Sequence, residues 1–217
     1  MNILITGGSG FVGGCLIKKL LKRNDIETIT SIDNYFTGTC ENEVNNDKVT
    51  YIKESTQNIN SIDFLKNKKF DILYHFGEYS RISTSFEEPN TVFSSNLTGT
   101  YKVLEFCRIN KCKLIYSGST SIFGNDMNDQ HSSPYSWSKA KNIELIHNYH
   151  KWFNLDFTIV YFSNVYGAGQ ISNGKYATVI GIFERQFNNR EQLTVVKPGT
   201  QKRDFTHIDD PINGIIL

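Results

Sequence analysis

Short apolar runs rich in β-branched residues recur along this chain of 217 residues. Each run is followed by glycine, serine or another polar residue, so the apolar stretches are bounded on both sides. Runs of this length and composition are typical of strands that are buried on both faces of a parallel sheet. The pattern predicts six strands, at 2–6, 28–32, 48–52, 71–76, 113–117 and 157–162.

Apolar positions at helical spacing fill most of the intervals between these strands. The predicted helices span 15–23, 61–65, about 90–110 and 134–153; Ser61 or an earlier residue caps the second, and Pro134 suits the first turn of the last. Strands that alternate with helices over six cycles predict an α/β fold, a Rossmann-type doubly wound parallel sheet with helices on both faces. Ligands in such sheets bind beyond the carboxyl ends of the strands.

The pattern loosens after residue 166. A helix is predicted over 178–187, a short strand over 193–196, and the start of a helix near 210. We therefore expect one domain at 1–166 and a small further region at 167–217.

Composition narrows the class of protein. The formal net charge of +1 argues against a nucleic-acid-binding protein, which normally carries a basic excess. No apolar run is long enough to span a bilayer, and the first residues lack a signal-peptide pattern. The four cysteines are scattered without a second ligand pair, so we expect reduced thiols, no metal site and a cytoplasmic protein without a membrane partner.

The first predicted strand runs into a glycine turn and then a helix. Gly7, Gly10 and Gly13 follow one another at intervals of three. Gly7 suits the tight turn, Gly10 lets the backbone approach a pyrophosphate, and Gly13 lets the helix pack closely on the strand. The turn could also serve only to join the strand to the helix, so the glycines alone do not establish a phosphate site.

The second predicted strand leads to Asp33, twenty positions after Gly13. A carboxylate at this spacing can accept hydrogen bonds from an adenosine ribose and would repel a 2′-phosphate. Together with the glycine turn, Asp33 predicts dinucleotide binding and favours NAD over NADP.

A second group of residues, Ser119, Tyr135 and Lys139, is a candidate for catalysis. Tyr135 and Lys139 lie four residues apart on one predicted helix, so their side chains share a face, and Ser119 lies just past the fifth strand. A free tyrosine has a pKa of about 10, and a nearby ammonium and a positively charged nicotinamide both favour its phenolate. Such a phenolate can take the proton from an alcohol while the carbon gives its hydride to NAD. The same spacing also occurs by chance on many helices.

These residues resemble the extended short-chain dehydrogenase/reductase family. The matching motifs are Thr6 to Gly13, Ser119, and Tyr135 to Lys139. Further segments resemble its nucleotide-sugar epimerase/dehydratase branch, which includes UDP-glucose 4-epimerases: 96–100, 163–167 and 203–210. The resemblance covers the chain end to end, and it implies an NAD-binding Rossmann domain at 1–166 and a partial substrate-binding region at 167–217.

By this resemblance, Tyr135 is the catalytic base, Lys139 binds the nicotinamide ribose and tunes Tyr135, and Ser119 is the third catalytic residue. The implied cofactor-binding residues are Gly7, Gly10, Phe11, Val12, Gly13, Asp33, Asn34, Ser55, Phe76, Gly77, Asn96, Tyr135 and Lys139. The implied substrate-binding residues are Ser80, Ser119, Thr120, Asn164 and Arg203, of which Arg203 would pair with the pyrophosphate unless it forms a surface ion pair with Asp204 or Asp209.

Departures from the family pattern narrow the reaction. The 4,6-dehydratases carry an acidic pair where Thr120 and Ser121 stand here, which disfavours dehydration. Glu78 is a charged residue where small apolar ones are common, and whether Arg81 faces a phosphate or solvent stays open. Family members also continue beyond the motif at 203–210, so this chain is either truncated or closes its sugar pocket in another way.

The resemblance thus implies an NAD-dependent nucleotide-sugar epimerase, with 4-epimerisation of a UDP-hexose through a transient 4-keto intermediate as the leading hypothesis. The alternatives are another NAD(P)-dependent nucleotide-sugar dehydratase or reductase, and a non-catalytic NAD-binding sensor. We expect a homodimer that associates through the helices at 91–110 and 135–153.

Overall fold

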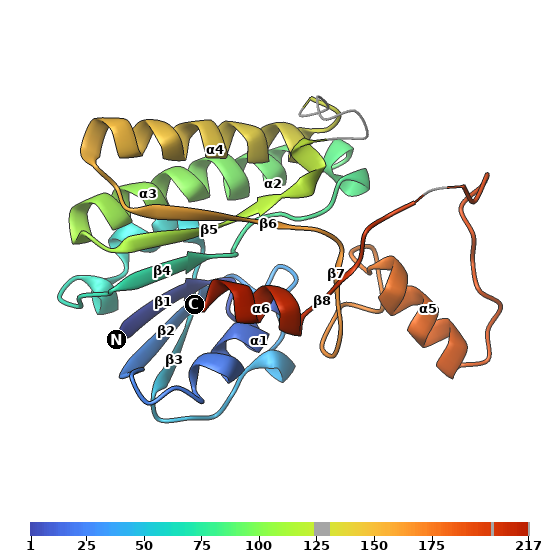
Figure 1. Ribbon diagram of the computed structural model, residues 1–217, viewed down its shortest axis with the longest axis horizontal. Helices are drawn as coiled ribbons and strands as arrows, with labels where there is room; N and C mark the ends of the chain where they lie inside the picture. Colours follow the sequence, from blue (N-terminus) through green and yellow to red (C-terminus); the bar gives the residue numbers. More distant parts are fainter. Residues whose placement is uncertain (124–130, 201, 217) are drawn as a thin grey trace.

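A six-stranded, all-parallel sheet forms the centre of the computed structural model, which describes residues 1–123, 131–200 and 202–216 (Figure 1). The strand order is β3-β2-β1-β4-β5-β6, the arrangement of a Rossmann-type doubly wound sheet. The strands are β1 (Asn2–Thr6), β2 (Thr28–Asp33), β3 (Val49–Lys53), β4 (Ile72–His75), β5 (Lys113–Ser119) and β6 (Phe157–Phe162). All six predicted strands and the predicted fold class are confirmed.

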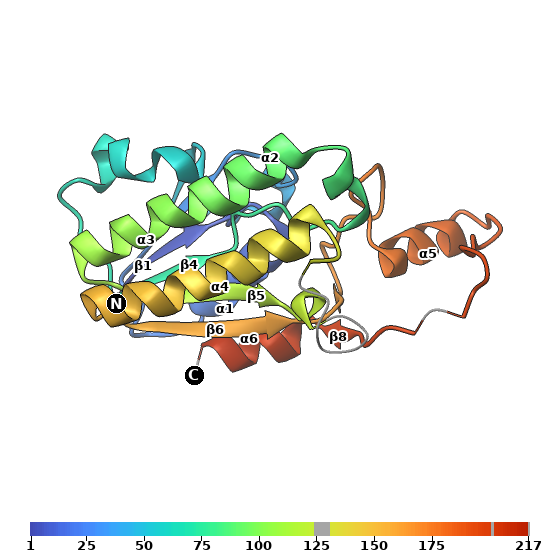
Figure 2. The same cartoon turned by 90° about the horizontal axis from the view of Figure 1, so that it is seen from above.

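Helices cover both faces of the sheet. They are α1 (Phe11–Leu20), α2 (Pro89–Phe93), α3 (Gly99–Asn110), α4 (Pro134–Phe153) and α6 (Asp209–Ile215), while α5 (Val179–Asn188) lies apart from the sheet. Figure 2 shows α2, α3 and α4 on one face, and α1 and α6 on the other. The alternation along β1 explains the two layers: Leu4 packs in the core under α3 and α4, whereas Ile3 and Ile5 pack in the core under α1.

The long helix predicted at about 90–110 is interrupted. It begins at Pro89, and a turn of π-helix, Ser94–Thr98, separates α2 from α3. A single π turn covers only five residues, which is too short a stretch for hydrophobic periodicity to reveal. The helix predicted at 134–153 has the predicted bounds, and the Ser133 hydroxyl caps it by accepting from the Ser136 N–H at 3.0 Å.

The connection between β3 and β4 differs from the prediction. Instead of one short helix at 61–65, it contains two 3-10 helices, Thr56–Ser61 and Asp63–Leu65. The cap of the first is Ser55, one of the residues before Ser61 that the prediction allowed, since its hydroxyl accepts from the Gln57 N–H. The short 3-10 turns bury Ile59 and Leu65 in the core under α3 and α4.

The part of the chain after β6 leaves the sheet and returns to it. Strand β7 (Val165–Tyr166) pairs in parallel with β8 (Thr206–His207), and α5 lies apart from the sheet between them (Figure 1). Helix α6 then packs against α1, so that Ile208, Ile212 and Ile215 join the core under that helix. The expected region 167–217 therefore contains an outlying part and a helix that belongs to the core of the sheet.

The short strand predicted at 193–196 is wrong. These residues form an extended loop without a strand partner, and Val195 and Val196 are 70% and 75% exposed. Their β-branched side chains suggest a strand, but a strand needs a neighbour that this segment does not reach.

In the part of the chain that the structure describes, we find no helix both long and apolar enough to cross a membrane.

Candidate active site

The glycine turn after β1 is shaped by close backbone contacts. Gly7 adopts a positive φ of 78°, and a side chain there would lie 2.8 Å from the backbone nitrogen of Gly77. A side chain on Gly13 would lie 2.2 Å from the carbonyl oxygen of Gly7. Only glycine fits at either position, so β1, β4 and α1 approach closely and leave the N-terminus of α1 at the carboxyl end of the sheet, where it can bind a phosphate.

Asp33 ends β2 beside this turn. Its two carboxylate oxygens accept hydrogen bonds from the Ser9 N–H at 3.0 Å and the Tyr35 N–H at 2.8 Å. Burial raises the pKa of Asp33, and these backbone donors oppose the effect. Each oxygen keeps acceptor capacity, so the fixed carboxylate can still receive ribose hydroxyls.

A cleft of about 580 Å³, including its open mouth, lies along the carboxyl ends of β1, β2 and β4. Six of the predicted cofactor-binding residues line it: Gly7, Gly10, Asp33, Asn34, Phe76 and Gly77. Residues that the sequence did not single out for this role also line it, namely Ile32, Phe36, Thr37, Glu54, Thr56, Glu78, Tyr79, Thr91 and Ser95. A glycine cradle at a helix N-terminus, followed by a fixed carboxylate, fits the pyrophosphate and the adenosine ribose of NAD.

Seven other predicted cofactor residues lie outside the lining: Gly13, Tyr135 and Lys139, together with Ser55, Phe11, Val12 and Asn96. The Ser55 hydroxyl caps a 3-10 helix. Phe11 and Val12 begin α1 and pack against the core under that helix. Asn96 is fully buried, and its side chain holds the backbone of Tyr79 by accepting from its N–H at 2.7 Å and donating to its carbonyl at 3.2 Å.

Tyr135 and Lys139 occupy the first turns of α4 and are 7% and 3% exposed. The Lys139 ammonium donates to the Ser117 carbonyl at 2.6 Å and to the Ser117 hydroxyl at 3.4 Å, and it forms an ion pair with Glu78. It also lies 4.9 Å from the centre of the Tyr116 ring, at a distance typical of a cation–π contact. Lys139 is therefore held at the end of β5 by Ser117 and Glu78, and Tyr135 lies one turn before it on α4.

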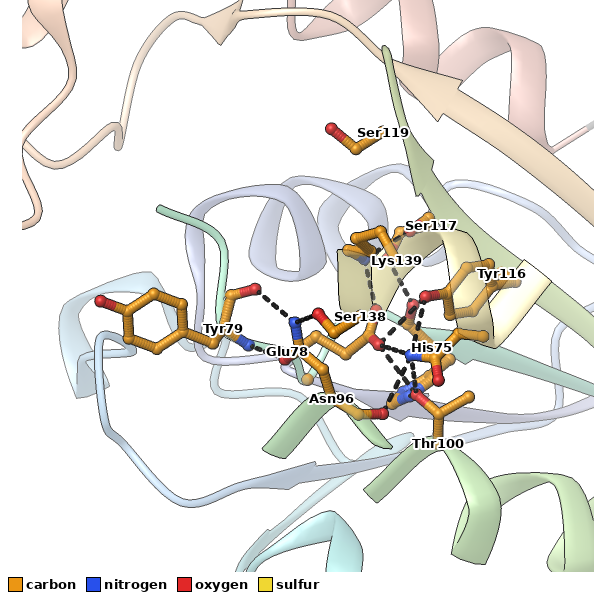
Figure 3. Close-up of polar contacts among 12 residues, drawn as sticks. His75, Glu78, Tyr79, Asn96, Thr100, Tyr116, Ser117, Ser119, Ser138 and Lys139 are labelled. Atoms are coloured by element: carbon orange, nitrogen blue, oxygen red, sulfur yellow. Dashed lines mark hydrogen bonds and ion pairs between the residues drawn. The ribbon is translucent and has the colours of Figure 1, made fainter. Parts of the chain in front are cut away.

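Glu78 follows β4 and has a side chain that is only 1% exposed. One of its carboxylate oxygens meets Lys139. The other accepts from the Thr100 hydroxyl at 2.8 Å, the Asn142 amide at 2.8 Å and the Tyr116 hydroxyl at 3.1 Å. Figure 3 shows these contacts converging from β4, β5, α3 and α4. Four donors thus converge on one buried carboxylate and fix its position.

His75 connects this network to the glycine turn. The Gly77 N–H donates to the Thr6 hydroxyl at 3.1 Å, and the Thr6 hydroxyl lies 2.6 Å from His75 Nδ1. His75 Nε2 lies 3.0 Å from the Thr100 hydroxyl, which itself donates to Glu78. These partners assign a neutral His75 with the proton on Nε2, and burial lowers its pKa to about 4.

The predicted serine at the end of β5 lies apart from this network (Figure 3). The Ser119 hydroxyl donates to the Ser121 hydroxyl at 2.9 Å and caps the short 3-10 helix Thr120–Ile122. The Thr120 hydroxyl donates to the Phe162 carbonyl at 3.3 Å. The hydroxyls of Ser119 and Thr120 are thus bonded to local partners at the end of β5.

The loop after β4 carries Ser80 and Arg81. Arg81 donates through Nε and Nη2 to the Tyr176 carbonyl at 2.8 and 2.6 Å, and through Nη1 to the Ser80 carbonyl at 3.0 Å. Burial lowers the pKa of Arg81, and Tyr135 is near enough to oppose this electrostatically. Arg81 therefore ties the loop to the segment before α5 and adds a cation on the Tyr135 side of the site.

The two other predicted substrate residues belong to the outlying part of the chain. The Asn164 amide donates to the Asp204 carbonyl at 2.9 Å, next to the β7–β8 pair. Arg203 is exposed and donates to the Lys202 carbonyl at 2.8 Å. Across residues 1–123, 131–200 and 202–216, Arg203 forms no ion pair, so the alternative of a pair with Asp204 or Asp209 does not hold in this structure.

Comparison with known proteins agrees with this geometry. The model of the NAD dependent epimerase/dehydratase family matches residues 3–217. A UDP-N-acetyl-alpha-D-glucosaminuronate decarboxylase of Bacillus cytotoxicus is 30% identical over 98% of this chain and 69% of its own.

Solved structures show the same likeness. The UDP-glucuronic acid 4-epimerase of Bacillus cereus, in complex with UDP-glucuronic acid and NAD, is 30% identical, with a TM-score of 0.86 over 100% of this chain and 72% of its own. The UDP-glucose 4-epimerase of Thermotoga maritima has a TM-score of 0.91 over the same shares of the two chains and is 23% identical, a likeness of fold alone.

Proposed function

Because the chain belongs to the NAD-dependent epimerase/dehydratase family, we propose that it is a nucleotide-sugar 4-epimerase that acts on a UDP-hexose. The observation that carries the proposal is the Lys139 ammonium, which Ser117 and Glu78 hold at the end of β5. Glu78 also lines the cleft of Asp33 and the glycine turn, and Tyr135 lies one turn before Lys139 on α4. The likeness to a 4-epimerase that binds UDP-glucuronic acid and NAD supports it.

The proposed roles follow from the chemistry of the side chains. Asp33 binds the adenosine ribose, and the N-terminus of α1 binds the pyrophosphate. Tyr135 takes the proton of the sugar hydroxyl and returns it, and Ser119 holds the same oxygen in line. NAD, the cofactor of this family, supplies the oxidation and the re-reduction of the sugar carbon.

The choice of epimerisation over dehydration rests on Thr120 and Ser121. Elimination of water needs an acid and a base next to Ser119, and neither hydroxyl can serve as one. The 30% identical decarboxylase shows that relatives run other reactions, so product analysis must separate inversion from loss of water or carbon dioxide.

We propose a division of labour along the chain. Residues 1–166 bind NAD, and 167–217 contribute to the sugar-nucleotide side, where Asn164 and Arg203 meet the diphosphate. A guanidinium suits this role because it binds phosphate oxygens through two parallel hydrogen bonds. Ser80 and Thr120 contact the sugar from the loops after β4 and β5.

The test is a panel of UDP-, GDP- and dTDP-sugars incubated with the protein and NAD, with products identified by NMR. Inversion at C4 of a UDP-hexose is the expected result. A product that lacks water or carbon dioxide would replace the proposed reaction with a dehydratase or decarboxylase. Tight NAD binding without any turnover would favour the non-catalytic sensor.

We also propose that two copies associate through the outer faces of α3 and α4. Large aromatic side chains stand exposed on these helices: Tyr101 is 44%, Trp152 61% and Phe153 48% exposed. Exposed aromatic clusters of this kind are typical of interfaces. Light scattering should give twice the mass of one chain, and a monomer would refute the association.

A further inference from the structure

The Lys139 ammonium is already satisfied by oxygen atoms of the protein. The Glu78 carboxylate, the Ser117 carbonyl and the Ser117 hydroxyl surround it, and an ammonium has three N–H groups to donate. The Tyr116 ring covers a further side at 4.9 Å. Lys139 is thus drawn toward the sheet instead of being held only by the cofactor.

Glu78 is built into the protein as the counter-charge. A buried charge is costly unless it is paired and hydrogen-bonded, and Glu78 has Lys139 and three neutral donors. Its side chain and that of Lys139 are 1% and 4% exposed, so solvent screens neither. The pair therefore carries no net charge toward its neighbours.

The other ionisable groups around Tyr135 leave this balance intact. His75 is neutral because burial lowers its pKa to about 4. Burial and the Glu78 carboxylate raise the pKa of Tyr116, and burial raises that of Tyr79, so both keep their protons. Arg81 is the further cation near Tyr135, and backbone carbonyls of Ser80 and Tyr176 hold it.

We propose that Glu78 is a positioning residue that holds the Lys139 ammonium against β5 and balances its charge, so that Lys139 stabilises the Tyr135 phenolate less than an unpaired lysine would. An opposite charge within a few ångströms favours an ionised group, whereas a balanced pair acts only as a dipole. This inference rests on the proposed role of Tyr135 as the base. It adds that the pH range of catalysis is set by Glu78.

The experiment reads the Tyr135 phenolate directly, without turnover. Ultraviolet absorbance is titrated with pH for the protein and for Tyr135→Phe, and their difference isolates Tyr135 from the other tyrosines. The same difference is taken between Glu78→Gln and Glu78→Gln/Tyr135→Phe. We expect the phenolate to form at a pH lower by about one unit or more in the Glu78→Gln background, which is about a tenfold gain in its fraction at a fixed pH.

A third background shows whether Lys139 carries the effect. In Lys139→Met/Glu78→Gln the downward shift should disappear, because no unbalanced ammonium remains. A titration that Glu78→Gln leaves unchanged or moves upward would overturn the proposal, as would a downward shift that persists without Lys139. If circular dichroism shows that Glu78→Gln does not fold, Lys139→Met replaces it in the experiment. Lys139→Met leaves the Glu78 charge unbalanced, so the Tyr135 phenolate should form at higher pH. The absence of this upward shift would refute the proposal.

Glu105→Gln is the matched control. Glu105 also accepts from a tyrosine hydroxyl, that of Tyr149 at 2.8 Å, and pairs with Arg108. Tyr149 lies fourteen residues after Tyr135 on α4, about 21 Å along the helix. Glu105→Gln should leave the pH at which Tyr135 ionises unchanged. A shift in Glu105→Gln as large as that in Glu78→Gln would refute a specific role for Glu78.

When a sugar substrate has been found, the low-pH limb of turnover should move in parallel with the phenolate titration in Glu78→Gln. The absorbance titration of Tyr135 needs no substrate, so it tests this inference even if the protein turns over no UDP-hexose. Failure of the proposed function and failure of this inference are therefore distinguishable.

Discussion

The two sides of the candidate site are held in very different ways. On the cofactor side, Glu78 and Lys139 are almost completely buried, and their contacts come from four elements of the fold. In the outlying part of the chain, Arg203, which we propose for the sugar-nucleotide side, is exposed and donates to the adjacent Lys202 carbonyl. The cofactor side is therefore ordered by the protein itself, whereas the proposed sugar-nucleotide side keeps its charged group available for a ligand.

This difference predicts where substitutions act. Changes on the buried side should alter chemistry, NAD binding or stability, because each removed group leaves a buried partner unsatisfied. Changes on the exposed side should alter substrate binding and leave the free energy of unfolding nearly constant.

The largest effect is expected for Tyr135→Phe. Loss of the base should reduce UDP-hexose turnover by about a thousandfold, since general base catalysis contributes about 10²–10⁴. NAD binding, measured by calorimetry, should persist. The control is Tyr149→Phe on the same helix, which removes a hydroxyl bonded to Glu105 and should keep turnover. Undiminished epimerisation in Tyr135→Phe would exclude this residue as the base.

The second effect concerns stability and pH. The pKa of His75 is lowered from 6.5 to about 4 in the folded protein, so the unfolded chain binds the proton more readily. The free energy of unfolding should therefore be highest above pH 6.5 and fall as the pH drops from 6.5 to about 4, by about 3 kcal/mol in total. Urea denaturation over this range measures it.

The control for this dependence compares two histidines. His75→Gln should reduce the decrease in the free energy of unfolding at low pH. Substitution of the exposed His147 by Gln should leave that decrease unchanged. An equal slope in the protein and in His75→Gln would mean that another group is responsible.

The third effect is on the cofactor. Asp33→Asn should weaken NAD binding about tenfold, because hydrogen bonds to a charged acceptor are worth about 1.5–3 kcal/mol. Calorimetric titration with NAD measures the change. Asp25→Asn, at an exposed ion pair with Arg23, provides the control. NAD affinity that is equal in both variants would remove Asp33 from the ribose site.

The sequence predicted the buried side better than the exposed one, for physical reasons. Buried strands such as β1 and β4 need continuous apolar runs, and α4 needs Pro134 and apolar spacing, so their signals are local. The strand predicted at 193–196 failed because a strand depends on a distant partner. The two-residue strands β7 and β8 are too short to show periodicity.

Within the site, local sequence motifs predicted individual residues but not the ion pair between Glu78 and Lys139. Gly7, Gly13 and Asp33 have roles fixed by spacing, and the structure places them as that spacing requires. The Glu78–Lys139 pair joins residues 61 positions apart, so no local pattern reveals it. The one available signal was a carboxylate directly after a buried strand, where an ionised side chain needs a partner.

The smallest effect is expected on the exposed side. Arg203→Gln should raise the KM for the UDP-sugar by a factor of a few up to about tenfold, through loss of a charge-assisted contact with the diphosphate. Its free energy of unfolding should change by less than about 0.5 kcal/mol. Substitution of the exposed Arg190 by Gln is the control. An unchanged KM in Arg203→Gln would detach this residue from the substrate.

The most direct measurement follows a UDP-hexose by NMR in deuterium oxide with the NAD-loaded protein. If Tyr135 and NAD oxidise C4 and then re-reduce it, the configuration at C4 should invert while the hydrogen on that carbon comes from the substrate and not from the solvent. Inversion with deuterium at C4, or a product formed without inversion, would contradict a 4-epimerase of this mechanism.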